Sequence, residues 1–252
     1  MRIITNHEAI EARKVGNQKE IVARNRKTGD TVSFLADELL IAAGRGSNSD
    51  ILHPEKAGIE TDEKGWIKVN EFLESSQENI WAFGDANGQH LFKHVGNYES
   101  MVVYYNAVLK REVKVDYHAI PSAVFTHPEI AHVGLGEKEA IAKYGEDQII
   151  IGYQKYEDTA KGMAMGVKDF FVKVILDNQR RILGAHIIGA QISILIQEII
   201  NLMYTPDRSM QPIREGIHIH PALSEVVERA FGRLMRPKDY HSFLEGTIYH
   251  HH

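Results

Sequence analysis

The sequence predicts an α+β domain, built on an antiparallel sheet with flanking helices, that follows a partial α/β region. Three observations lead to this prediction. In the C-terminal half, strand-like apolar runs follow one another with short polar turns or single helices between them. Strongly apolar helical patterns flank these runs. In the N-terminal half, an uncharged run at 80–83 ends in Gly84 and Asp85, which places a carboxylate at the carboxyl edge of a sheet.

The sequence of the first 44 residues predicts a β-meander that leads into a buried strand. Strand-like runs occupy 21–25, 31–36 and 38–44, and the turn-forming sequence KTGD at 27–30 connects the first two. A loop rich in Gly, Ser and Asn follows at 44–50. We therefore place the first domain boundary after residue 44.

Residues 45–115 predict the α/β region. A strand is expected at 66–69, and the uncharged run at 80–83 predicts a buried strand followed by a tight turn. Apolar residues at helical spacing then predict a helix from about Lys93 to Arg111. The composition shifts near 113–118, so the second boundary is placed there.

Residues 116–241 predict the α+β domain. Its strands are expected in two pieces within 115–134 and at 149–157, 170–177 and 182–189. A short helix is expected at 136–145, and the helical pattern at 192–204 is so apolar that we expect it to lie in a core or an interface. A last helix begins with Pro221 in its first position. Residues 242–252 form a tail whose three histidines resemble a purification tag and are excluded from any site.

Composition and charge exclude several classes of function. The 252 residues are 43% hydrophobic and 25% charged, which is ordinary for a soluble protein. A net charge of −5 argues against nucleic-acid binding through a basic surface. The absence of cysteine excludes a disulfide framework, a thiolate zinc site and a cysteine nucleophile. Without a signal peptide or an apolar run near the ~20 residues of a membrane helix, we expect a cytoplasmic protein with no membrane contact.

The sequence HIHPALSE at 218–225 is the strongest candidate for acid–base chemistry. With Pro221 opening a helix, His220 would lie at the helix N-terminus and Glu225 one and a half turns inside. The glutamate could reach back to the imidazole, fix its tautomer and stabilise its charged form, while the helix dipole opposes that charge. Such a histidine can exchange protons near neutral pH. The alternative is a capping histidine beside a surface glutamate.

Two further segments could bind a ligand. Asp85, after Gly84, could accept hydrogen bonds from the hydroxyl groups of a sugar or ribityl chain, or it could merely cap the next helix. Gly44 and Arg45 follow a strand-like run in a turn that could admit a cofactor closely, or could be a plain turn. The histidines at 127, 132, 218 and 220 lack the spacing of common metal sites, so we expect no metal.

In their order along the chain, these segments resemble the C-terminal half of the FAD-dependent pyridine nucleotide–disulfide oxidoreductases, and most of all the dihydrolipoamide dehydrogenases. LLIAAGRGSN at 39–48 is similar to the family's strand and GRxPN turn, but it departs from that pattern at Ala43 and Ser47. The other segments that resemble the family are 57–86, 121–140, 170–191 and 218–225. The resemblance covers nearly all of residues 1–241.

The resemblance implies a role for each candidate residue. His220 matches the acid/base of a redox dithiol, and Glu225 matches the glutamate that orients it. Asp85 matches the aspartate that binds the flavin ribityl chain, with Gly84, Gly44 and Arg45 beside the cofactor. The implied cofactors are FAD and either NAD or NADP. Residues 1–44 would end the nicotinamide-binding domain, 45–115 would close the FAD-binding domain, and 116–241 would form the interface domain of a homodimer.

The family's GxGxxG flavin motif, its cysteine pair and its nicotinamide-binding motif have no counterpart in the sequence. We therefore expect the C-terminal portion of a disulfide oxidoreductase that retains the His–Glu dyad, with a separate N-terminal half as a further partner. The alternatives are a non-catalytic dimerisation module and, more remotely, a metal-dependent enzyme. We also expect residues 45–110 to expose apolar edges and to be mobile, re-paired or covered by a second chain.

Overall fold

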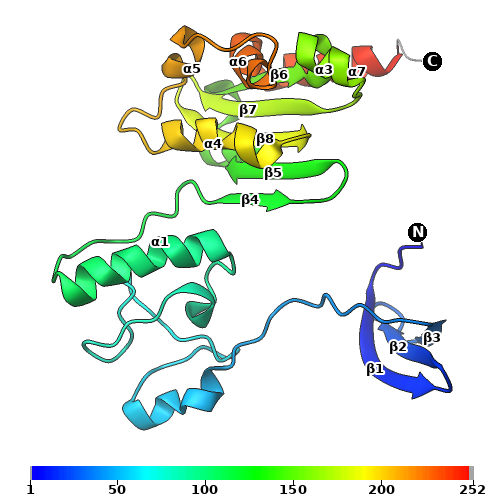
Figure 1. The fold of residues 1–252 in the computed structure, drawn as a ribbon, viewed down its shortest axis with the longest axis vertical. Helices are drawn as coiled ribbons and strands as arrows, with labels where there is room; N and C mark the ends of the chain where they lie inside the picture. The colour runs from blue at the N-terminus through cyan, green and yellow to red at the C-terminus, as the bar shows by residue number, and fades with distance from the viewer. Residues whose placement is uncertain (1, 250–252) are drawn as a thin grey trace.

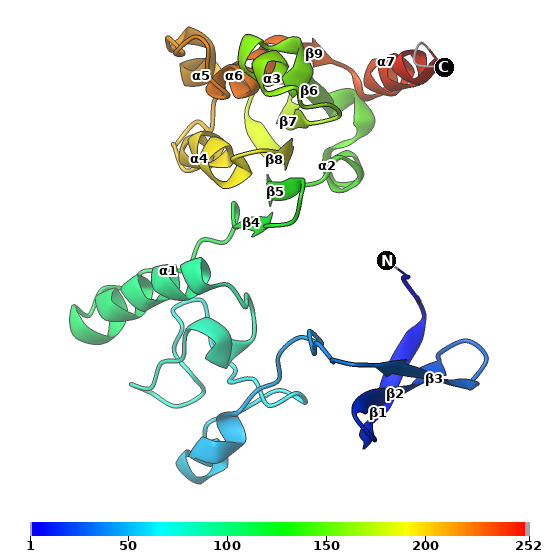
Figure 2. The same cartoon turned by 45° about the vertical axis from the view of Figure 1, so that its right-hand side comes forward.

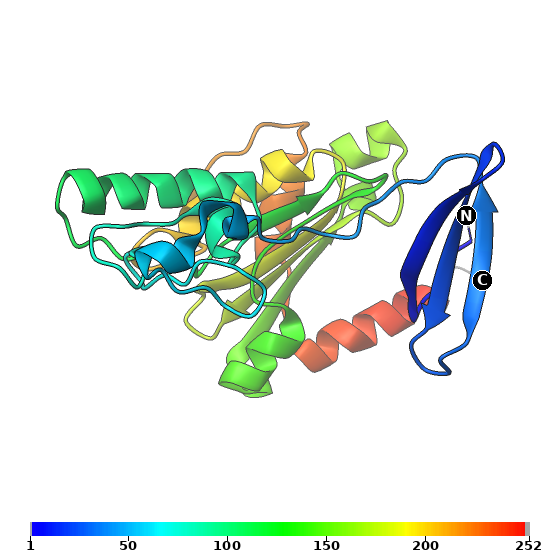
Figure 3. The same cartoon turned by 90° about the horizontal axis from the view of Figure 1, so that it is seen from below.

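The computed structural model describes residues 2–249, which form three parts along the chain (Figure 1). An N-terminal β-meander stands apart from the rest, as Figure 3 also shows. An extended segment leads from it to a middle part built around the helix α1. The C-terminal part contains a six-stranded sheet covered by helices on both faces.

The β-meander confirms the expected hairpin pattern. Its strands β1 (His7–Val15), β2 (Gln18–Asn25) and β3 (Thr31–Ala36) are antiparallel and adjacent in chain order. The Asn25 side chain accepts hydrogen bonds from the backbone N–H groups of Lys27 and Thr28, which shapes the turn between β2 and β3. Only Ala23 is buried within these strands, so the meander has almost no core of its own.

The strand expected at 38–44 is absent, and this prediction was wrong. Leu40 and Ile41 are 90% and 77% exposed in an extended segment that pairs with no strand among residues 2–249. A run of apolar residues becomes a strand only where a neighbouring strand satisfies its backbone groups. The segment therefore keeps the composition of a buried strand without its partners.

The middle part is mostly irregular. It contains the 3₁₀ turns Ser49–Leu52, Pro54–Ala57 and Gly84–Asn87, then α1 (Lys93–Val103), which continues as a π-helical turn at Tyr104–Val108. The expected helix at 93–111 is thus largely confirmed. The prediction of strands at 66–69 and 80–83 was wrong, because these residues form only isolated bridges, such as that of Trp81 with Glu74. Ile80 and Phe83 are exposed, for lack of neighbouring strands in the described chain.

The C-terminal sheet confirms the predicted antiparallel architecture. Its strands lie in the order β4-β5-β8-β7-β6-β9 and every pair is antiparallel. They are β4 (Pro121–Val124), β5 (Glu129–Gly134), β6 (Ile149–Lys155), β7 (Phe171–Asp177), β8 (Ile182–Gly189) and β9 (Leu234–Met235). Both faces of β6 and β7 are buried, which explains their nearly unbroken apolar sequences.

Helices cover the two faces of this sheet separately (Figure 2). On one face, α4 (Ile192–Met203) and α6 (Ser224–Gly232) pack on Ile150 and Val174 in the larger core. On the other face, α2 (Glu137–Tyr144) and α7 (Pro237–Tyr249) cover Ile149 and Ile151. The short helices α3 (Ala160–Met165) and α5 (Gln211–Glu215) complete the part, with 3₁₀ turns at Glu146–Gln148 and Tyr156–Asp158.

The C-terminal residues extend this domain. Helix α7 continues past residue 241, where we placed the start of a tail, and Leu244 packs against the smaller core. The three terminal histidines that were excluded from any site lie outside the described residues. None of the helices within 2–249 is long and apolar enough to cross a membrane.

Candidate functional site

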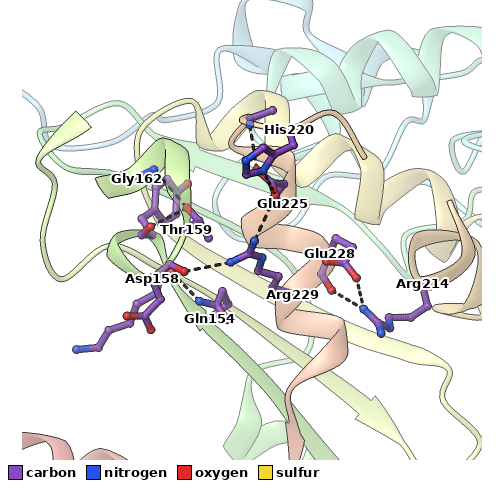
Figure 4. Close-up of polar contacts among 12 residues, drawn as sticks. Gln154, Asp158, Thr159, Gly162, Arg214, His220, Glu225, Glu228 and Arg229 are labelled. Atoms are coloured by element: carbon purple, nitrogen blue, oxygen red, sulfur yellow. Dashed lines mark hydrogen bonds and ion pairs between the residues drawn. The ribbon is translucent and has the colours of Figure 1, made fainter. Parts of the chain in front are cut away.

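His220 and Glu225 form the hydrogen-bonded pair expected from their sequence motif (Figure 4). Nδ1 of His220 lies 2.8 Å from Oε1 of Glu225. The second carboxylate oxygen, Oε2, accepts the backbone N–H of Ala222 at 3.1 Å. The side chain of Glu225 is 10% exposed and that of His220 is 63% exposed. A buried carboxylate therefore holds one side of an imidazole whose other side faces outward.

The local geometry differs from the expected one in where the helix begins. Helix α6 starts at Ser224 and not at Pro221, so Glu225 lies in its first turn and not one and a half turns inside. The Glu225 carboxylate accepts the N–H of Ala222, and residues 220–223 form the loop that leads into the helix. Proline at 221 suggested a helix start, but it is equally suited to this loop.

The contacts of Glu225 fix its ionisation state. The hydrogen bond from His220 holds the pKa of Glu225 below its usual value, against the opposing effect of burial, and the Ala222 N–H and the Arg229 charge add to the lowering. Glu225 is therefore ionised at neutral pH and can only accept hydrogen bonds. Nδ1 of His220 must be the donor in this pair, so Nε2 is the nitrogen left to exchange a proton.

Two residues around the pair, Arg229 and Glu198, were not singled out by the sequence analysis. Arg229 donates from Nη2 to Oε1 of Glu225 at 3.3 Å. Nε2 of His218 lies 3.1 Å from Oε1 of Glu198 on α4, which ties the loop before His220 to the core helix. The spacing of four residues between Glu225 and Arg229 is a sequence signal for the first contact, whereas Glu198 lies too far along the chain to be found that way.

The second group of predicted residues lies in the middle part of the chain. Asp85 forms an ion pair with Arg45, and both side chains are partly exposed. Gly84 has a φ of +65°, a conformation that favours glycine, and its N–H donates to Oε2 of Glu99 at 2.5 Å. Gly44 also has a positive φ, of +93°, with no other atoms near the position of a Cβ. The structure thus brings Arg45, Gly84 and Asp85 together.

A fully buried carboxylate supports this turn. Glu99 on α1 accepts hydrogen bonds from Asn87 Nδ2 at 3.2 Å and from the Tyr117 hydroxyl at 2.5 Å, besides the one from Gly84. Burial, with the Glu99 charge beside it, raises the pKa of Tyr117 well above its usual value, so the hydroxyl remains a donor. Glu99 therefore fixes the backbone immediately before Asp85.

Two cavities flank the Arg45–Asp85 pair. One, of about 480 Å³, lies toward Ser47 and Trp66, and the other, of about 380 Å³, lies toward Phe92 and Lys93. The Asp85 carboxylate can accept hydrogen bonds from hydroxyl groups of a ligand, and the cationic side chains of Arg45 and Lys93 could contact its anionic groups. An extended ligand that passes over Gly84 would meet both kinds of group.

The other histidines form no metal centre in the part of the chain that the structure describes. His132 and His186 face each other across β5 and β8 with their rings stacked at 5.9 Å. Burial lowers the pKa of His186, which keeps that ring neutral. No three His, Asp or Glu side chains within 2–249 lie as metal ligands would.

Comparison with known proteins identifies the family. Residues 120–231 match the dimerisation domain of the pyridine nucleotide-disulphide oxidoreductases, and residues 1–110 match the pyridine nucleotide-disulphide oxidoreductase family model. The chain belongs to the pyridine nucleotide–disulphide oxidoreductases. This confirms the resemblance seen in the sequence, and the fold class with it. Members of the family are flavoproteins that use FAD with a nicotinamide cofactor, and their dimerisation domain joins two subunits.

Relatives in this oxidoreductase family include more than one kind of enzyme. A mycothione reductase of Mycobacterium tuberculosis is 42% identical over 207 residues, which are 80% of this chain and 44% of that protein. A dihydrolipoyl dehydrogenase of Synechocystis is 34% identical over 229 residues, which are 87% of this chain and 48% of that protein. The HOCl-induced flavoprotein disulfide reductase RclA of Escherichia coli superimposes with a TM-score of 0.76 at 26% identity, covering 90% of this chain and 51% of RclA. The chain thus spans about half the length of these relatives.

Proposed function

We propose that this chain is the C-terminal portion of a flavoprotein disulfide oxidoreductase, and that His220 and Glu225 are its acid–base pair. The observation that carries the proposal is the 2.8 Å contact between Nδ1 of His220 and the ionised carboxylate of Glu225. It leaves Nε2 on an exposed ring as the proton-exchanging atom. An isolated surface histidine would not have its tautomer fixed in this way.

In this role His220 moves one proton at Nε2. It accepts the proton of a thiol as the thiolate forms, and it returns a proton to the thiolate that leaves when a disulfide is reduced. Glu225 stabilises the imidazolium between these two steps and keeps the ring in one orientation. The chain has no cysteine of its own, so the thiols would come from another polypeptide segment.

The residues of the middle part fit a portion of the family's FAD site. Asp85 would accept hydrogen bonds from ribityl hydroxyl groups, Arg45 would face the phosphates, and Gly84 and Gly44 would allow the ligand to approach the backbone. FAD would supply electron transfer between a nicotinamide cofactor, NAD or NADP, and the dithiol. Residues 1–44 would contribute the end of the nicotinamide-binding domain.

The proposed partners are a second copy of the chain, joined through residues 116–241, and a separate N-terminal half. The second partner is supported by exposed apolar side chains of the extended segment, Leu40 and Ile41, and of the middle part, which include Leu52 and Phe92. Such surface in an α/β domain is normally covered by further strands and helices.

The competing function is a dimerisation module without catalysis. The absence of cysteine favours it, because the chain alone cannot carry a dithiol. Under this alternative His220 and Glu225 keep their geometry but take part in no reaction.

Complementation separates these two functions. The chain is mixed with an N-terminal half that carries the flavin motif and the cysteine pair, for example that of the mycothione reductase, and nicotinamide-dependent reduction of a small disulfide is measured. We expect turnover with the wild-type chain and a loss of about 10²- to 10⁴-fold with His220→Gln. His7→Gln, in the distant β-meander, serves as the matched control. A flavin-loaded mixture without turnover would favour the dimerisation module, and equal rates for both variants would overturn the role of His220.

A further inference from the structure

Arg229 connects the His220–Glu225 pair to the rest of the C-terminal sheet (Figure 4). It lies on α6 one turn after Glu225, and its guanidinium contacts two different elements. Nη2 donates to Oε1 of Glu225 at 3.3 Å. Nη1 donates at 3.1 Å to the backbone carbonyl of Asp158, in the 3₁₀ turn that follows β6. Because the guanidinium is planar and rigid, these two bonds fix its orientation.

Both oxygens of the Glu225 carboxylate are held by donors. Oε1 accepts from His220 and from Arg229, and Oε2 accepts from the Ala222 N–H. His220 and Ala222 belong to the loop that precedes α6, so neither of them anchors the carboxylate to the sheet. Arg229 does, through the carbonyl of Asp158. Without it, both remaining donors to the carboxylate would come from the loop, and the sheet would no longer fix the orientation of the carboxylate.

We propose that Arg229 is a positioning residue for the His220–Glu225 pair. It holds Oε1 where Nδ1 of His220 can donate to it, so that the neutral imidazole carries its proton on Nδ1 and leaves Nε2 unprotonated. The inference rests on the proposed function for its catalytic meaning, but the geometry and its test do not depend on turnover.

The chain contains a matched control for this role. Arg233 lies one turn further along the chain from Arg229, with the same charge and a similar exposure, and its Nη1 is 3.8 Å from Oδ2 of Asp158. It thus also reaches the turn after β6, but through the side chain of Asp158, and its ion pair does not include Glu225. Replacing either arginine by methionine keeps an unbranched side chain and removes one positive charge.

The tautomer of His220 is the direct readout. In the ¹⁵N-labelled chain, long-range ¹H–¹⁵N correlation spectra distinguish Nδ1–H from Nε2–H, and His220→Gln assigns the signals. In the wild type, at a pH where the ring is neutral, we expect the Nδ1–H form to dominate. Arg229→Met should raise the ratio of the Nε2–H to the Nδ1–H form by about fivefold, the effect of one net hydrogen bond. Arg233→Met should leave the ratio at the wild-type value.

Each remaining outcome is decisive. An unchanged ratio in a folded Arg229→Met chain, or an equal change with Arg233→Met, would show that Arg229 acts only in packing or through long-range charge. If Arg229→Met does not fold, Arg229→Lys replaces it, because one ammonium can satisfy only one of the two partners, and a ratio identical to the wild type would then overturn the proposal. If Arg229→Met raises the ratio as expected but the chain mixed with an N-terminal half shows no turnover, only the proposed function is refuted.

Discussion

Glu137, at the start of α2, lies between Lys173 and His241 on the α2–α7 face of the sheet. It forms an ion pair with Lys173 of β7, and its Oε1 is 2.6 Å from Nε2 of His241 on α7. Burial raises the pKa of Glu137, but the hydrogen bonds from Lys173 and His241 outweigh that effect and hold it below the usual value of 4.5. Glu137 therefore joins three elements as a carboxylate.

The lowered pKa of Glu137 gives stability a defined pH dependence. Its contribution is present above the unfolded-state pKa of about 4.5 and is lost as the pH falls through the lower folded-state value. We expect Glu137→Gln to lower the free energy of unfolding by about 1 kcal/mol at pH 6, with the difference shrinking below about pH 4. Urea unfolding at both pH values measures this. Glu146→Gln, at an exposed position, should show no such difference, and a pH-independent loss in Glu137→Gln would contradict the ionic role.

The sequence revealed some residues of the candidate site and not others. His220 and Glu225 lie five positions apart with a proline between them, so their pairing could be inferred locally. Asp85 could be located because it ends an apolar run. Glu99 and Glu198 could not be found, since each meets its partner across the fold, and nothing in their local sequence distinguishes them from surface glutamates.

At the scale of elements, β6 and α6 approach each other more closely than most strand and helix pairs can. The contact depends on Gly152, where an added Cβ would lie 2.3 Å from the carbonyl oxygen of Ala230 on α6 and 2.6 Å from Val174 of β7. Since α6 also carries Glu225 and Arg229, its distance from β6 sets the position of the Glu225 carboxylate relative to the sheet.

This close packing predicts the effect of one added methyl group. Gly152→Ala should lower the free energy of unfolding by about 1–3 kcal/mol, because α6 must move away from the sheet to make room. Gly246→Ala, on α7 with open space around it, should leave stability unchanged or slightly higher. Urea denaturation of both variants provides the measurement. Equal stabilities would mean that α6 is not packed directly on β6.

Elements were predictable where their own residues determine them. Strands β6, β7 and β8 carry long apolar runs, and α4 carries a strong helical pattern, so all four were located within a few residues. The segments 38–44 and 80–83 have equally apolar sequences, but residues 2–249 provide no neighbouring strands for them to pair with. Strand formation depends on partners elsewhere in a sheet, and a local pattern carries no information about their presence.

At the scale of the whole molecule, a large amount of apolar surface remains uncovered. On the C-terminal part, exposed hydrophobic side chains occur on and directly after β4, on α4 and in the loop before His220. They include Val124, Phe125, Ile194, Ile217 and Ile219. A monomeric protein rarely exposes so many large apolar side chains on one domain, so this distribution supports assembly through residues 116–241.

Assembly of this kind can be measured directly. We expect sedimentation to give twice the chain mass of 28.5 kDa at micromolar concentration. Ile194, on α4 with 69% of its surface exposed, should lie in the contact, and Ile194→Glu should weaken dimerisation at least about tenfold by burying an unpaired charge. Leu35→Glu, on the exposed face of the β-meander, is the matched control. A monomeric wild-type chain would refute the homodimer.

The buried carboxylate of Glu99 connects the middle part of the chain to the linker that precedes the C-terminal sheet. It binds the backbone before Asp85 on one side and the Tyr117 hydroxyl on the other, and Tyr117 belongs to the short linker between the middle part and β4. The Tyr98 hydroxyl on the same helix accepts the N–H of Asp116 in that linker. These hydrogen bonds connect the linker both to α1 and to the turn that carries Asp85, so a rotation of the C-terminal sheet about the linker would have to break them or move that turn.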